Sequence, residues 1–254
     1  MTDADAALAG RAVLVTGASS GIGAAVCRSI VGCGGSVAML ARRKDRLAEL
    51  HEELGDRAIA VPGDVTDLDA LAGVVAEAAD RLGGLDGLVA AAGRTMAGGI
   101  TSGTPERWRA LFELNLLAPL ASVRHAVGHF AGTGRRDVVL VGSVGAVTPI
   151  PSAGIYSASK RGLRAACDSL RLELAPLGIS TSLVMPGMFE TEGLTLEGLE
   201  IDGDVPPDGI PYLVPGAGPA DPAVVGDTIA FMLGLPEGVG INELVVRPTG
   251  QLNP

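Results

Sequence analysis

Near the start of the chain stands Val13-Leu-Val-Thr-Gly-Ala-Ser-Ser-Gly-Ile-Gly23, an apolar β-branched run that leads into three glycines. The run predicts a strand, and the glycines predict a turn into a helix. Glycine at positions 17, 21 and 23 lets the backbone turn tightly and approach a bound group, and the N–H groups at a helix start suit a pyrophosphate. The stretch therefore predicts a dinucleotide site, although similar turns occur in α/β proteins that bind nothing there.

The composition predicts one well-filled globular domain over residues 1–254, with 47% hydrophobic and 19% charged residues. A net charge of −10 opposes binding to phosphate backbones and anionic lipid, so we expect neither nucleic-acid nor membrane partners. The acidic first residues lack the features of a signal peptide, which favours a cytoplasmic location. The three cysteines lack the spacing of metal ligands, and we interpret them as reduced thiols: Cys27, Cys33 and Cys167.

Short β-rich runs alternate with longer helical stretches, which is typical of an α/β fold with a doubly wound parallel sheet and helices on both faces. Strands are expected at Ala12–Thr16, Ser36–Leu40, Ala58–Val61, Gly87–Ala91, Val138–Gly142, Ser180–Met185 and Glu243–Arg247. Helices are expected over Ala24–Val31, around Lys44–Leu54, around Trp108–Leu116 and over about Ser157–Leu174. Between Phe189 and Pro222 the composition shifts to Gly, Pro, Asp and Glu, which predicts a mobile insertion.

Further motifs follow the glycine turn in a fixed order: Asp64-Val65, Asn115, Ser143, Tyr156-Ser-Ala-Ser-Lys160 and Pro186-Gly187. Together with Thr16-Gly-Ala-Ser-Ser-Gly-Ile-Gly23 they resemble the classical short-chain dehydrogenase/reductase family over nearly the whole chain. The resemblance implies a single Rossmann-type domain and an NADP-dependent, ketoreductase-like activity. Such an enzyme moves a hydride between nicotinamide and a carbonyl or secondary alcohol. It also implies a homo-oligomer, either a dimer or a homotetramer.

Tyr156 and Lys160 are four residues apart on a predicted helix, so their side chains lie on one face. A phenol with a pKa of about 10 becomes useful near neutral pH if an ammonium and an oxidised nicotinamide stabilise its phenolate. Tyr156 is therefore the candidate general acid and base. By resemblance, Ser143 holds the substrate oxygen, Lys160 also holds the nicotinamide ribose, and Asn115 holds a water that links Lys160 to solvent. Taken singly, each of these residues is also typical of a helix surface or a turn.

The resemblance also assigns residues to the cofactor. Asp64 and Val65 would lie at the adenine, and Thr191 would contact the nicotinamide carboxamide. The complete set expected at the cofactor is Gly17, Ser19, Ser20, Gly21, Ile22, Gly23, Arg42, Arg43, Asp64, Val65, Gly93, Tyr156, Lys160, Pro186, Gly187 and Thr191. One departure stands out: the family commonly has Asn-Asn-Ala-Gly where this chain has Ala90-Ala-Ala-Gly93. The missing amides would change stability or cofactor affinity and leave the acid–base residues untouched.

The residues after the second predicted strand indicate a preference for NADP(H) over NAD(H). An acidic residue at the end of that strand would take both ribose hydroxyls of NAD and repel a 2′-phosphate. Here that position is Ala41, and Arg42 and Arg43 follow with planar cations that suit a phosphate. The alternative is that this pair merely begins a charged helix face.

Two function classes remain open for this chain. The first is an enzyme that acts on a small, largely apolar carbonyl or alcohol substrate, with residues of about 190–218 as a substrate lid. That segment carries several leucines and isoleucines but no cation for a carboxylate or phosphate, so phosphorylated substrates are disfavoured. The second is a nucleotide-binding sensor or partner protein that keeps the fold without turnover. The combined set of Asn115, Ser143, Tyr156 and Lys160 favours the enzyme, because a sensor has no need of an acid there.

Overall fold

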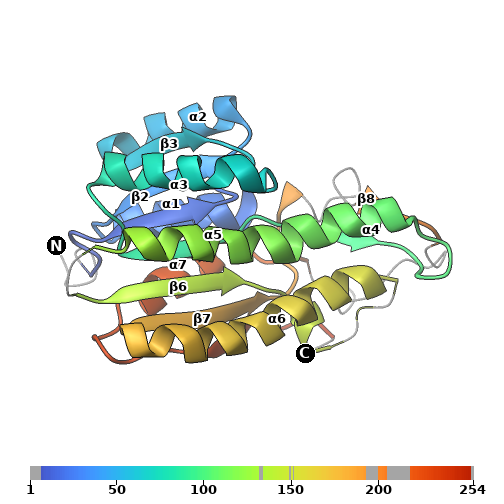
Figure 1. The fold of residues 1–254 in the computed structure, drawn as a ribbon. Helices are drawn as coiled ribbons and strands as arrows, with labels where there is room; N and C mark the ends of the chain where they lie inside the picture. Colours follow the sequence, from blue (N-terminus) through green and yellow to red (C-terminus); the bar gives the residue numbers. More distant parts are fainter. Residues whose placement is uncertain are drawn as a thin grey trace.

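A computed structural model describes residues 7–131, 134–148, 150, 152–192, 200–204 and 218–252. Within these residues lies a seven-stranded sheet in the order β3-β2-β1-β4-β6-β7-β9, and every neighbouring pair is parallel (Figure 1). The strands match the seven expected ones to within two residues at each end. They are β1 (Ala12–Thr16), β2 (Ser36–Ala41), β3 (Ala58–Pro62), β4 (Gly87–Ala90), β6 (Arg136–Val141), β7 (Ile179–Pro186) and β9 (Glu243–Val246).

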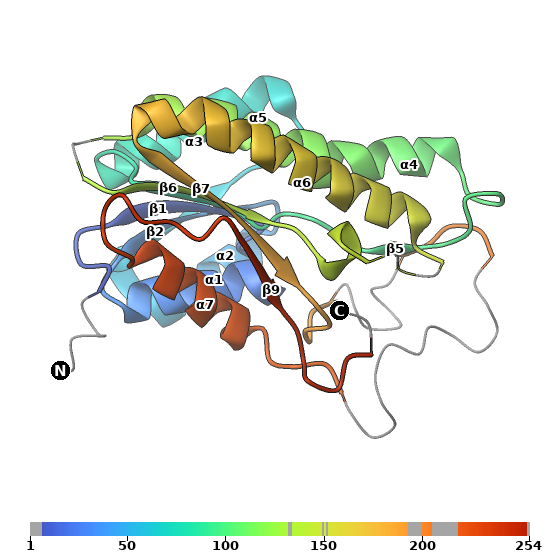
Figure 2. The same ribbon diagram turned by 90° about the horizontal axis from the view of Figure 1, so that it is seen from below.

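Helices cover both faces of this sheet, and Figure 2 shows α3, α5 and α6 above it and α1, α2 and α7 below it. Successive strand residues point to opposite faces, so Val13 and Val15 enter the core below while Leu14 enters the core above. The expectation of a doubly wound, single-domain α/β fold is confirmed. The helices are α1 (Gly21–Gly32), α2 (Lys44–Leu54), α3 (Leu68–Leu82), α5 (Ala118–Ala126), α6 (Gly154–Leu174) and α7 (Ala223–Leu233).

The strand order places a crevice at the carboxyl ends of β1 and β4. The chain runs outward from β1 through β2 to β3, then returns to the other side of β1 as β4. The connections after β1 and β4 therefore leave in opposite directions, and ligands of open α/β sheets bind at such a switch point. The glycine turn follows β1 and lies at this crevice.

The helix expected around Trp108–Leu116 is interrupted. It consists of α4 (Pro105–Phe112), a π-helical turn η3 (Glu113–Leu117) and then α5. Two short parallel strands, β5 (Met96–Ala97) and β8 (Glu200–Ile201), were also not predicted, because two residues each are too short for a periodic pattern. They lie beyond the end of the main sheet, beside α4 (Figure 1).

Part of the expected insertion is described. Phe189 forms a parallel bridge with Ala220, and β8 pairs with β5. The other parts of the expected lid, 193–199 and 205–217, lie outside the described residues.

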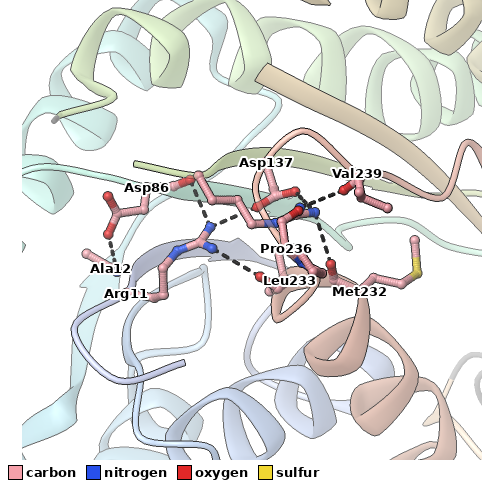
Figure 3. A network of polar contacts seen from close by, with 9 residues as sticks. Arg11, Ala12, Asp86, Asp137, Met232, Leu233, Pro236 and Val239 are labelled. Atoms are coloured by element: carbon pink, nitrogen blue, oxygen red, sulfur yellow. Dashed lines mark hydrogen bonds and ion pairs between the residues drawn. The ribbon is translucent and has the colours of Figure 1, made fainter. Parts of the chain in front are cut away.

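A buried ion-pair network joins several elements at the amino ends of the strands (Figure 3). The carboxylate of Asp137, in β6, contacts Arg11 at 2.9 Å and Arg135 at 2.6 Å. Both guanidinium groups also donate to carbonyl oxygens at the end of α7: Arg11 to Leu233 and Arg135 to Met232. Because carbonyls at a helix end lack partners within the helix, these arginines cap α7 and fix it to the sheet.

Candidate functional site

Two positions at the turn after β1 have no room for a side chain. Gly17 has a φ of +70°, and a Cβ there would lie 2.7 Å from the Cα of Ala92, two residues past the end of β4. A Cβ on Gly23 would collide with the carbonyl oxygen of Gly17, so α1 can pack this close to the turn only with glycine at that position. These glycines keep the turn close to both β4 and α1, and the first N–H groups of α1 have no partner within the helix. This cradle fits a pyrophosphate.

A cleft of about 520 Å³ opens over the cradle and runs across the sheet edge. It is long enough to join the residues after β1, β2 and β3 to the start of α6. Of the residues expected at the cofactor, those that line the cleft are Gly17, Ser19, Ser20, Gly21, Ile22, Gly23, Arg42, Arg43, Asp64, Val65, Gly93, Tyr156, Lys160 and Thr191. Pro186 and Gly187 are not in its wall: Pro186 ends β7, and the Gly187 N–H donates to the Val246 carbonyl at 2.7 Å.

At the α6 end of the cleft, Tyr156 lies 7% exposed. Ser143 and Thr95 lie beside it, and their hydroxyl groups act to lower the pKa of the phenol. Ser143 lies two residues past the end of β6 as the N-cap of a short 3₁₀ helix, where its Oγ accepts from the Gly145 N–H at 3.1 Å. The structure thus brings together Tyr156 and Ser143, and adds Thr95, which belongs to none of the sequence motifs described above.

Lys160 lies one helical turn beyond Tyr156, buried, and donates from Nζ to the Val141 carbonyl at 3.0 Å. Nearby, the π-helical turn presents Asn115, whose amide donates to the Arg94 carbonyl at 3.0 Å and to Ser159 Oγ at 3.2 Å. A Cβ on Gly93 would lie 3.1 Å from Asn115 Oδ1 and 3.3 Å from Lys160 Nζ. Glycine at 93 is therefore what lets these two polar side chains approach the end of β4.

Burial has the largest effect on the pKa of both Tyr156 and Lys160. It raises the pKa of Tyr156 above its usual value of 10, although the hydrogen bonds to Ser143 and Thr95 oppose that rise. It lowers the pKa of Lys160 from 10.5 to about 8. From the sequence we expect the ammonium and an oxidised nicotinamide together to lower the pKa of Tyr156. In the chain by itself the balance runs the other way, because desolvation penalises the phenolate.

The two arginines after β2 are placed differently. Arg42 is 74% exposed and lies 3.7 Å from the Asp64 carboxylate. Arg43 turns toward the glycine turn and donates from Nε and Nη2 to Ser19 Oγ at 3.2 and 3.1 Å. Asp64 is desolvated, which raises its pKa, but hydrogen bonds from Thr66 and the charge of Arg42 outweigh this effect and lower the pKa overall. Both arginines line the cleft on the side of the adenosine ribose expected for this fold.

Comparison with known proteins agrees with this geometry. The family model for short chain dehydrogenases matches residues 11–198, and the chain therefore belongs to the short-chain dehydrogenase/reductase family of oxidoreductases. This family binds nicotinamide cofactors.

Among its relatives, an uncharacterised oxidoreductase of Mycobacterium tuberculosis is 39% identical over 71% of this chain and 74% of its own length. A glycine betaine reductase of Emericella nidulans is 35% identical over 95% of this chain, which spans only 19% of that protein's length.

Solved structures are similar over almost the whole chain. A dehydrogenase/reductase from Sinorhizobium meliloti is 28% identical with a TM-score of 0.83, and 96% of each chain is covered. A short chain dehydrogenase from Burkholderia cenocepacia, solved in complex with NADP, is 27% identical with a TM-score of 0.79 over 94% of this chain and 97% of that one.

Among the residues that the structure describes, no helix has the length and apolar character needed to cross a membrane. The His, Cys, Asp and Glu side chains of the same residues form no cluster of three that could hold a metal ion.

Proposed function

We propose that this chain is an NADP(H)-dependent oxidoreductase that transfers a hydride between nicotinamide and the carbonyl or secondary alcohol carbon of a small, largely apolar substrate. The observation that carries the proposal is Tyr156, buried at one end of the dinucleotide cleft with Ser143 beside it. A site for nucleotide binding alone has no use for a buried acid at that place.

In this proposal, Tyr156 exchanges a proton with the substrate oxygen: it donates in reduction and accepts in oxidation. Ser143 holds the same oxygen and stabilises the negative charge that develops on it. The positive charge of Lys160 favours the phenolate, and its position one turn from Tyr156 also suits the ribose hydroxyls. When bound, the nicotinamide supplies or accepts the hydride.

Asn115 has a narrower role in the proposal. Its side-chain N–H groups are taken by Arg94 and Ser159, so the water expected beside Lys160 is better held by the main chain. A π-helical turn shifts the backbone hydrogen-bond register by one residue and so changes the partners of its carbonyl groups. We therefore assign the relay role to the backbone of the π-helical turn.

The wall around Tyr156 supports an apolar substrate. Apolar side chains from β5, α4, the loop before α6 and the first turn of α6 form one cluster with the tyrosine: Met96, Trp108, Leu111, Ile150, Ala153 and Ile155. Arg94 lines the same cleft, but Glu200 neutralises it at 2.8 Å. Of the residues once expected to form the lid, most lie outside the described residues, so this wall and not the lid supports the substrate class.

The test is the variant Tyr156→Phe, assayed by NADPH oxidation with a panel of small ketones and diketones. Loss of the proton donor is expected to lower turnover by roughly 10²- to 10⁴-fold, since general acid catalysis typically contributes that much. NADPH affinity should stay within about twofold, because the ring and its packing are retained, whereas Lys160→Ala should lower both.

Retention of more than about a tenth of the wild-type rate would show that Tyr156 is not the acid. If the wild-type chain binds NADPH and turns over nothing in the panel, the sensor alternative is favoured.

A further inference from the structure

The guanidinium of Arg43 is held from two sides. Its Nε and Nη2 donate to Ser19 in the glycine turn, and its Nη1 contacts the carboxylate of Glu192 at 2.7 Å. Glu192 follows Thr191, and the two residues line the same cleft as Arg43. Arg42, in contrast, is mostly exposed, and its contact within the described residues is with the Asp64 carboxylate at 3.7 Å. Arg43 is thus the arginine whose donors are oriented into the cleft.

The carboxylate of Glu192 marks the position at which the guanidinium of Arg43 can bind an anion. Arginine donors pair with carboxylate and phosphate in the same geometry, and Ser19 completes the arrangement with a hydroxyl. We infer that Glu192 is a specificity-determining residue that competes with the 2′-phosphate of NADP(H) for Arg43. The inference rests on the proposed function, because it assumes that the cofactor carries this phosphate.

The competition follows from charge. A 2′-phosphate is dianionic near neutral pH, so it both needs the Nη1 edge of Arg43 and is repelled by a carboxylate already there. NAD(H) presents only hydroxyls at that position and meets neither effect. Glu192 therefore reduces the advantage of NADP(H) over NAD(H) without reversing it, as the arginines remain.

The structure also provides space for Glu192 to leave Arg43. A second cavity of about 850 Å³ lies between α1, α2 and α7, and Glu192 lines this cavity as well as the cleft. Its side chain is half-exposed and stands on the rim that the two share. A rotation of the side chain can thus release Arg43 without moving the glycine turn.

The experiment measures binding of 2′,5′-ADP and 5′-AMP by calorimetry in the full-length wild-type chain and in Glu192→Gln. These probes differ at the 2′-phosphate and lack the nicotinamide, so the readout is independent of turnover. We expect Glu192→Gln to tighten 2′,5′-ADP binding about fivefold, a modest value because the ion pair is partly exposed. Binding of 5′-AMP should change by less than about twofold.

The control is Glu190→Gln, which removes the same charge two residues away on an exposed side chain that does not contact Arg43 in the described residues. It should leave the ratio of the two dissociation constants unchanged. An Arg43→Gln, Glu192→Gln double variant should bind 2′,5′-ADP no more tightly than Arg43→Gln alone, since the guanidinium for which Glu192 and the phosphate compete is gone.

An unchanged ratio in Glu192→Gln, beside a wild type that prefers 2′,5′-ADP, would overturn the role of Glu192 and leave the NADP(H) preference intact. A wild type with no preference, in which Glu192→Gln creates one, would refute the native preference and retain the role of Glu192. If neither the wild type nor Glu192→Gln prefers 2′,5′-ADP, both the NADP(H) preference and the role of Glu192 are wrong.

Discussion

Asp137 is expected to be among the most costly single positions of this chain to neutralise. In Asp137→Asn, two guanidinium groups that are 15% and 10% exposed lose their shared anion, while side-chain volume is kept. Removing one partner of a buried ion pair typically costs about 3–5 kcal/mol. The amide oxygen still accepts one hydrogen bond and both arginines keep their carbonyl acceptors on α7, so we expect the lower end, about 3 kcal/mol.

Urea unfolding followed by circular dichroism measures this loss. With a slope near 3 kcal/mol per molar for a chain of this size, the midpoint should fall by about 1 M. Glu106→Gln is the matched control, because its ion pair with Arg109 is exposed on both sides and should contribute nothing measurable. Nucleotide affinity should be unchanged, since the network lies at the strand ends opposite the cleft. A loss below about 1 kcal/mol would refute the reasoning.

Three further outcomes are expected at the site. The Ala41→Asp, Arg42→Ala double variant should lose roughly 10- to 100-fold in kcat/KM for NADPH and little for NADH, and a parent that already prefers NADH would contradict the assignment. Thr95→Val removes a hydrogen bond that lowers the pKa of Tyr156, so the rise of the alcohol oxidation rate with pH should move to higher pH. An unmoved profile would exclude Thr95 from the acid–base cluster. Burial lowers the pKa of Lys160 to about 8, so the folded chain is destabilised below pH 8 and the penalty disappears as the pH rises toward 10.5. Lys160→Met should therefore raise the urea midpoint more at pH 7 than at pH 10, and equal shifts would count against a buried ammonium.

Local patterns were sufficient for the framework of this protein. Alternating apolar residues and the glycines at 17, 21 and 23 depend on backbone sterics and burial within a few residues, so the β1-turn-α1 unit could be predicted from the sequence. The spacing of Tyr156 and Lys160 is likewise a property of one helix. Strand ends were less certain, because the last residues of a strand look like the loops that follow them.

Only the tertiary structure decided which side chains meet. The hydroxyl of Thr95 reaches Tyr156, 61 positions along the chain, and Arg43 reaches Glu192, 149 positions away. The π-helical turn around Asn115 was also invisible, because an extra residue in a turn hardly alters the apolar pattern on which a helix prediction depends. Periodicity reports which face of an element is buried. The partner that a buried polar group finds depends on how distant elements pack, and this information is spread over the whole chain.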